Sequence, residues 1–209
     1  MKIVLEKDRQ LLMHSPLYQF TNENSDEPNT VTILQQPAAD AYKPFSISDK
    51  QGWIYFDLWS YSFAIQLQEV LKAHDTVKGV LRLRRTTNNF SYIEEDIIAL
   101  SEWFGTVRNV SVRSNEIGEN HYTIVLCEFG ESIMAHLEYR TGQDRIEFEW
   151  SSHLHIAEFD SLQMTGDSDN NQNLFKNIDA VHQYAVQWNN IYDEKLAAVR
   201  LLLQRGELR

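Results

Sequence analysis

The sequence is poor in cysteine, proline and glycine, and each shortage excludes a class of structure. Cys127 is the one cysteine among 209 residues, so no disulfide can form within the chain. All four prolines fall within the first 44 residues, so we expect short strands and loops there and longer elements after them. Gly52 is the first glycine, and neither a G-x-G-x-x-G loop nor a P-loop lysine signature occurs anywhere.

Long apolar runs and an excess of positive charge are also missing. No stretch of about 18 apolar residues is present to span a membrane, and the opening MKIVLEKDRQ lacks the apolar segment of a signal peptide. The net charge of −11 opposes the approach of a nucleic acid. Together with the single cysteine, these features predict a cytoplasmic protein that binds neither membranes nor nucleic acids.

The chain has enough apolar residues for a core, since 43% are hydrophobic and 11% aromatic. Segments 2–6 and 31–35 are predicted to be strands. Between Leu58 and His74, apolar residues recur at helical spacing and predict a helix. Gly79 ends this pattern, and the alternation in GVLRLRRT over 79–86 predicts a strand. The spaced apolar residues of the helix are Phe63, Leu67, Val70 and Leu71.

A second helix is predicted from Ser91 to Phe104. Ser91 and Glu94 have the spacing of a capping box, in which each side chain accepts from the other residue's backbone N–H. Gly105 is placed to end the helix as a C-cap. Its expected buried stripe consists of Ile93, Ile97, Leu100 and Phe104.

A run of strands follows this helix, over 107–113, 122–129, 133–140, 145–150 and 153–162. Most alternate apolar and polar residues, whereas 122–129 is apolar on both faces. The short linkers 129–131 and 141–144 fit hairpins, so we expect adjacent antiparallel strands on either side of each.

The end of the chain is predicted to be helical. TGDSDNNQN over 165–173 reads as a loop, and residues 174–203 as helix with a break at Asn189-Asn190. Asn190 is placed to cap the second part, with Asp193 in its first turn. The predicted fold is α+β: an open, mostly antiparallel sheet with helices on one face, over 58–209. A short irregular α/β segment over 1–57 precedes it.

Candidate metal sites are incomplete. His153 and His155 share one side of a strand, but no spacing requires a further ligand such as His136 or Asp160. The loop from Asp167 to Asn171 resembles the start of a calcium loop, but Gln172 and Ile178 stand where its glycine and bidentate glutamate belong. We therefore predict no metal site.

Other reactive side chains are accounted for by structure. The acidic triplet Glu94, Glu95 and Asp96 suits a helix N-terminus, where the helix dipole favours negative charge. Cys127 lies in an apolar strand and is expected in the core. The basic cluster Arg82, Arg84 and Arg85 is interpreted as a solvated strand face, with anion binding as the alternative.

Three stretches resemble the Gfo/Idh/MocA family of oxidoreductases, which join an NAD(P)-binding Rossmann domain to an open antiparallel sheet. VTILQQPAA over 31–39 resembles the strand that leads into the family's Glu-Lys-Pro motif. Residues 67–84 resemble the helix, glycine and strand that open the sheet domain. DIIALSEWFG over 96–105, with the strand after it, resembles the next helix and strand.

The resemblance also shows what is lost. The lysine of Glu-Lys-Pro corresponds to Gln36, and the family's His-x-x-Asp pattern falls on Glu95 and Ile98. Gln36 cannot act as an ammonium, and Ile98 cannot transfer a proton. The resemblance thus implies a Rossmann domain that is truncated or missing, with no catalytic residue, cofactor or metal retained.

Three hypotheses follow from the sequence. The first is a non-catalytic relative of these oxidoreductases that acts as a binding or self-association domain, homodimeric through the face of its sheet. The second is an active NAD(P)-dependent oxidoreductase with an atypical site or a cofactor domain supplied by a partner. The third is a module that binds a sugar or another small molecule.

Overall fold

The structure is a computed structural model of the whole chain. It describes residues 2–4, 19–21, 30–34, 52–54, 56–61, 63, 67–68, 78–88, 90, 92–118, 120–153, 156–162, 186–187 and 190–207.

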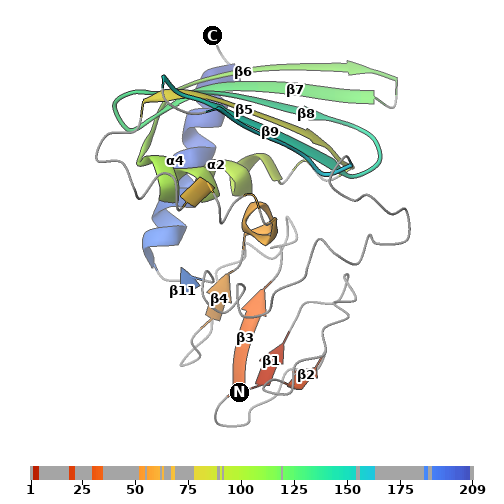
Figure 1. Cartoon of the computed structure of the whole chain (residues 1–209), viewed down its shortest axis with the longest axis vertical. Helices are drawn as coiled ribbons and strands as arrows, with labels where there is room; N and C mark the ends of the chain where they lie inside the picture. Colours follow the sequence, from red (N-terminus) through yellow and green to blue (C-terminus); the bar gives the residue numbers. More distant parts are fainter. Residues whose placement is uncertain are drawn as a thin grey trace.

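A six-stranded open sheet dominates the described part of the chain (Figure 1). Its strand order is β10-β9-β5-β8-β7-β6, and every neighbouring pair is antiparallel except β5 with β8. This confirms the predicted α+β class with a mostly antiparallel sheet. The strands are β5 (Gly79–Thr86), β6 (Val107–Ile117), β7 (Asn120–Phe129), β8 (Ile133–Arg140), β9 (Arg145–Ser151) and β10 (Ile156–Asp160).

The helices lie on one face of this sheet, as predicted (Figure 1). We call this face the inner face and the opposite one the outer face. The helical elements are η1 (Asp57–Ser60), α2 (Tyr92–Phe104) and α4 (Asn190–Glu207). Gly206 lets α4 approach the sheet closely, since a Cβ there would lie 2.9 Å from the carbonyl oxygen of Val110 on β6.

The core lies between the inner face and the helices. Strand alternation sends Ile133, Ala135, Leu137 and Tyr139 of β8 inward, where each is at most 3% exposed. Ile146, Phe148 and Trp150 of β9 are buried in the same way, as predicted. In a strand, successive side chains point to opposite faces of the sheet, so every second residue of β8 and β9 is buried against the helices.

One predicted hairpin is wrong. The linker 129–131 does join the adjacent antiparallel strands β7 and β8, but β8 and β9 are not neighbours, because β5 lies between them. The linker 141–144 therefore crosses two strand spacings, about 10 Å, which four residues can span. The alternation of apolar and polar residues in β8 and β9 fits both adjacent strands and strands separated by β5. Strand order depends on pairing with segments far away in the sequence, which alternation does not indicate.

The helix predicted over 58–74 starts differently. Residues 57–60 form the 3-10 turn η1, and Tyr61 is extended, which ends it. The turn directs two consecutive side chains, Leu58 and Trp59, into the core. Phe63 and Leu67 are helical and buried, as predicted, while Val70 and Leu71 lie outside the described residues.

The helix prediction over 174–203 holds only in part. α4 begins at Asn190, where the break was expected, and continues to Glu207. Val186 and Gln187, predicted helical, instead form the short strand β11. The loop 165–173 and the first helical part lie outside the described residues.

A second, five-stranded sheet has the order β11-β4-β3-β1-β2. Its neighbours are parallel except β11 with β4 (Figure 1). The strands are β1 (Lys2–Val4), β2 (Gln19–Thr21), β3 (Thr30–Leu34), β4 (Gly52–Ile54) and β11 (Val186–Gln187). β1 lies within the predicted strand segment 2–6, and β3 overlaps the segment 31–35 but begins one residue earlier.

The end of α2 follows its predicted capping. Gly105 has φ +87°, and its N–H donates to the carbonyl oxygen of Ser101 at 3.0 Å, as a left-handed C-cap requires. Ser91 lies outside the described residues. Ile97, Leu100 and Phe104 are buried, while Ile93 is half-buried. Among the described helices, none is long and apolar enough to cross a membrane.

The turn between β7 and β8 offers a test of the packing beside α2. Gly130 has φ +55°, and a Cβ there would lie 2.6 Å from the carbonyl oxygen of Phe104. Gly118 has φ +63° with open space around it. Both Gly→Ala changes carry the left-handed penalty of about 1 kcal/mol, but Gly130→Ala adds a backbone clash. We expect Gly130→Ala to lower the free energy of unfolding by about 1 kcal/mol or more beyond Gly118→Ala in urea titrations. Equal losses would contradict this packing.

Candidate functional site: the outer face of the sheet

The outer face carries an exposed apolar patch, made of Val80, Leu126, Met134 and Ile156. These side chains are 55%, 44%, 48% and 71% exposed, respectively. Large exposed apolar side chains that cluster together mark interaction sites more often than isolated ones do. We refer to these four residues as the apolar patch.

Strand register builds the patch. Val80 of β5 pairs with Met134 of β8, and on its other side with Ser151 of β9, which pairs with Ile156 of β10. Directly paired residues share one face of a sheet, so these side chains form a row across four strands. Leu126 of β7 pairs with the residue two positions along β8 from Met134. Leu126 and Met134 are therefore diagonal neighbours on the same face of the sheet.

A network of ion pairs occupies the outer face beside the patch. Arg84 lies 3.4 Å from Glu138 and 3.3 Å from Glu147. Arg145 lies 2.6 Å from both Glu147 and Asp160. Arg84 of β5 therefore bridges carboxylates on the strands at either side of it, β8 and β9, and Arg145 links Glu147 of its own strand to Asp160 of β10.

These pairs shift the pKa values of their members. The hydrogen bonds from Arg145 hold the pKa of Asp160 below its ordinary value, outweighing the opposite effect of burial. The pKa of Arg84 is raised, chiefly by its hydrogen bond to Glu147. Burial, assisted by the negative charge of Glu138, raises the pKa of Tyr122, whose hydroxyl donates to that carboxylate.

A pocket of about 420 Å³ opens among these charges. It is lined by Arg82, Arg84, Arg145, Glu147, Phe148, Glu149, Glu158, Phe159 and Asp160. Arg82 is the most loosely held of its three arginines, at 3.7 Å from Glu149, with both side chains more than 40% exposed. The pocket thus offers both donors and acceptors to a small polar molecule.

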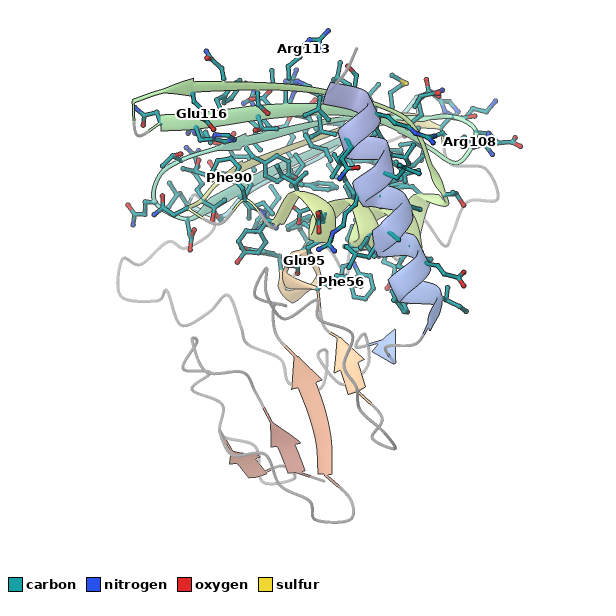
Figure 2. All side chains as sticks on the ribbon, turned by 180° about the vertical axis from the view of Figure 1, so that it is seen from behind. Phe56, Phe90, Glu95, Arg108, Arg113 and Glu116 are labelled. Carbon is teal, nitrogen blue, oxygen red and sulfur yellow. The ribbon has the colours of Figure 1, made fainter. Side chains whose placement is uncertain are left out.

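Opposite edges of the outer face carry opposite charge. β10 contributes Glu158 and Asp160, while β6 contributes Arg113 and Arg108, both exposed. Figure 2 shows Arg113 projecting from the side of the sheet away from the helices. A two-fold related copy could place each edge over the other.

The inner face holds a buried ion pair that the sequence analysis missed. Arg85 donates to both carboxylate oxygens of Asp96, at 3.0 and 2.7 Å, and the Tyr139 hydroxyl donates to the same carboxylate at 3.1 Å. The guanidinium also stacks 4.1 Å from the centre of the Tyr92 ring. Arg85 is 4% exposed and Asp96 is fully buried. Burial raises the pKa of Tyr139 well above its ordinary value.

This pair corrects two predictions. Arg85 does not share the solvated strand face of Arg82 and Arg84, because it has the inward parity of Leu81 and Leu83 on β5. That parity was the signal available in the sequence. The second correction concerns Asp96, which was attributed to the helix dipole. It is fully buried and paired with Arg85.

The other two residues of the acidic triplet, Glu94 and Glu95, also contact the rest of the fold or are buried in it. Glu94 accepts from Arg200 of α4, with both carboxylate oxygens 3.0 Å from the guanidinium Nε. Glu95 and Ile98, the two positions on which the resemblance placed the His-x-x-Asp pattern, are 2% and 1% exposed on this helix. Gln36 lies outside the described residues, so its position relative to them stays untested.

The candidate metal ligands and Cys127 do not form a site in the described part of the chain. Among the described residues, no three His, Cys, Asp or Glu side chains converge to hold a metal. His155 and the loop from Asp167 to Asn171 lie outside that part of the chain. Cys127 is buried, and burial raises the pKa of its thiol to about 12, which makes it a poor nucleophile at neutral pH.

The sequence between β1 and β4 bears on whether a nicotinamide dinucleotide fits the parallel sheet. In such proteins, glycines after the first strand let the backbone approach the pyrophosphate. No glycine stands between β1 and Gly52, at the start of β4. The residues present therefore do not fit this cofactor in the usual way.

The chain matches no protein-family model and no curated protein sequence. Its fold is similar to that of a dehydrogenase from Chromobacterium violaceum, with a TM-score of 0.51 and 14% identity, covering 64% of this chain and 47% of that one. The WlbA (WbpB) dehydrogenase from Thermus thermophilus, in complex with NAD and UDP-GlcNAcA, aligns with a TM-score of 0.48 and 11% identity, covering 86% and 65%. This chain thus spans less than two thirds of either protein, and the first likeness establishes a dehydrogenase-like fold alone.

The buried pair predicts a non-additive mutational response. Removing one partner leaves an uncompensated charge, so Arg85→Met or Asp96→Leu should each lower the free energy of unfolding by about 3–5 kcal/mol. The double variant should lose less than the sum of the two, because it buries no unpaired charge. Urea titrations of the four proteins measure this difference, and additive losses would refute the coupling.

Proposed function

We propose that this protein is a non-catalytic relative of Gfo/Idh/MocA-type oxidoreductases whose sheet works by self-association. In this proposal, two copies form a homodimer through their outer faces. The apolar patch is the observation that carries the proposal, because it leaves four large apolar side chains in water in the single chain.

A second copy suits the face in both chemistry and charge. A two-fold axis along the central strands β5 and β8 would place β10 of one copy over β6 of the other. Strand register places Asp160 and Arg113 in one row across the sheet, so Asp160 and the nearby Glu158 would then lie close to Arg113 of the other copy, and this pair of edges would occur twice. Such symmetric complementarity favours association of like chains, although the whole protein carries a net charge of −11.

The absence of redox activity is supported by the site residues. The family positions fall on Gln36, Glu95 and Ile98, and Ile98 supplies no group that could transfer a proton. The dehydrogenase-like fold supports the lineage and says nothing of the activity. The lost glycine loop supports the view that no nicotinamide cofactor binds.

A second candidate function is the binding of a small polar molecule, such as a sugar. The pocket beside Arg82 and Glu149 favours it, because this loosely paired arginine can exchange its carboxylate for a ligand at little cost. Such a ligand would occupy the same face as the proposed partner, so ligand binding should compete with association.

Sedimentation equilibrium at micromolar concentration tests the dimer. We expect Met134→Glu to raise the dimer dissociation constant by about 100-fold, because it buries an unpaired charge in the interface. Leu201→Glu is the matched control, since Leu201 is 46% exposed on α4, away from the outer face. A wild-type monomer, or equal weakening by both variants, would contradict the proposal.

A charge exchange tests the orientation of the two copies within the same experiment. Arg113→Glu and Glu158→Arg should each weaken the dimer, and the double variant should recover much of the loss. If the double variant does not recover the loss, the proposed two-fold axis is excluded. Whether the protein dimerises through the outer face is then decided by the Met134→Glu result alone.

Cofactor titration separates this proposal from an active oxidoreductase. We expect NADH and NADPH to leave the fluorescence of the five tryptophans unchanged up to millimolar concentration. Saturable quenching at micromolar concentration would overturn the non-catalytic assignment. Glucose and a uronic acid, titrated in the same way, test the pocket.

A further inference from the structure

Four polar side chains form a continuous hydrogen-bonded chain near the tip of the β6–β7 hairpin. Ser114 Oγ lies 3.0 Å from Thr123 Oγ1, which lies 3.0 Å from His121 Nε2. His121 Nδ1 lies 3.0 Å from Glu116 Oε1. Hairpin register creates this chain, because Ser114 pairs with Thr123 and Glu116 pairs with His121.

The direction of the protons follows from the donor and acceptor capacity of each group. The Glu116 carboxylate can only accept, so His121 Nδ1 carries the proton. In the neutral imidazole, Nε2 must then accept, and Thr123 must donate to it. Thr123 has one hydroxyl proton, so its oxygen accepts from Ser114. The chain is thus polarised from Ser114 toward Glu116.

The base at the centre of this chain is held from several sides. The His121 ring meets the Phe90 ring edge-on, with centroids 4.3 Å apart. Its backbone N–H donates to the Thr141 hydroxyl at 2.9 Å, and the Thr141 N–H donates back to the His121 carbonyl at 3.0 Å. Figure 2 shows Glu116 at the end of the hairpin and Phe90 on the helix side of the sheet. These contacts fix the imidazole before any reaction.

Both ends of the chain reach solvent, and its middle is covered. Thr123 is 3% exposed, whereas Ser114 and Glu116 are exposed to solvent. The Ser114 hydroxyl is therefore linked through a buried hydroxyl to a histidine that a carboxylate orients. This is the relationship between nucleophile, base and orienting acid found in hydrolases, lengthened by one hydroxyl.

We propose that Ser114 is an activated nucleophile that accepts acyl groups from small activated esters, a site separate from the outer face. Ser114 Oγ attacks the ester carbonyl, forming a new C–O bond. Its proton passes to Thr123 as the Thr123 proton passes to His121 Nε2. Collapse of the intermediate breaks the bond to the leaving alcohol, which takes that proton from His121. The products are acylated Ser114 and the free alcohol, and Thr123 and His121 return to their starting protonation.

The remaining residues act through Ser114 and are positioning residues. Glu116 holds the imidazole tautomer and stabilises its positive charge during transfer. Thr123 carries the proton across the gap between Ser114 and His121.

p-Nitrophenyl acetate is the probe, with p-nitrophenolate release followed by absorbance and the acetylated residue located by peptide mass spectrometry. We expect one acetyl group on Ser114. His121→Gln should slow acetylation of Ser114 by about 100-fold, as is typical for loss of a general base. Thr123→Val should slow it comparably, and Thr123→Ser should restore it. Glu116→Gln should slow it about 10-fold and alter its pH profile.

Ser132 supplies the matched control, as an exposed serine outside the chain of hydrogen bonds described here. Ser132→Ala should leave the rate unchanged. Acetylation of Ser132 as fast as Ser114 would overturn the proposal. So would rates unchanged by both His121→Gln and Glu116→Gln. Glu116 is exposed, so Glu116→Gln should fold even where a variant of a more buried residue does not, and circular dichroism checks each variant.

Discussion

The buried ion pair between Arg85 and Asp96 joins the centre of the sheet to the helix that covers it. It draws together β5, α2 and, through the Tyr139 hydroxyl, β8. Two charges in a dry core are tolerated only when each satisfies the other, so the pair admits few alternative packings of α2. The aromatic core around Phe104 and Trp150 then fills the space that this arrangement leaves. The geometry of the inner face follows from that requirement.

The two faces of the sheet differ in burial, because the inner face packs against the helices and the outer face is exposed. Because consecutive residues of a strand point to opposite faces, the same segments that bury Leu81 and Leu83 also display Val80 and Arg82. The hydrogen-bonded chain of Ser114, Thr123, His121 and Glu116 lies near the tip of the β6–β7 hairpin, outside the apolar patch.

Local pattern predicted the elements well and their arrangement poorly. The period of two in 133–140 and 145–150 gave strands with the correct buried residues, and Gly105 gave the end of α2. Alternation carries no record of strand order, so the insertion of β5 between β8 and β9 had no local signal. Arg85 could have been assigned to the core from its parity. The pairing of Ser114 with Thr123 was not predicted, because it depends on the register of the β6–β7 hairpin, and the predicted strands ended at 113 and began again at 122.

The place of β5 between β8 and β9 has a consequence for how the protein is made. Both neighbours of this strand are synthesised well after it, and one of them pairs with it in parallel. Until β9 has left the ribosome, β5 has no partner on that side, and its apolar residues stay accessible to other chains. Contacts between distant segments also slow folding, because a long loop must close before they form. The central sheet therefore completes only after β9 has emerged, and chaperones that shield apolar strands have most to protect in that interval.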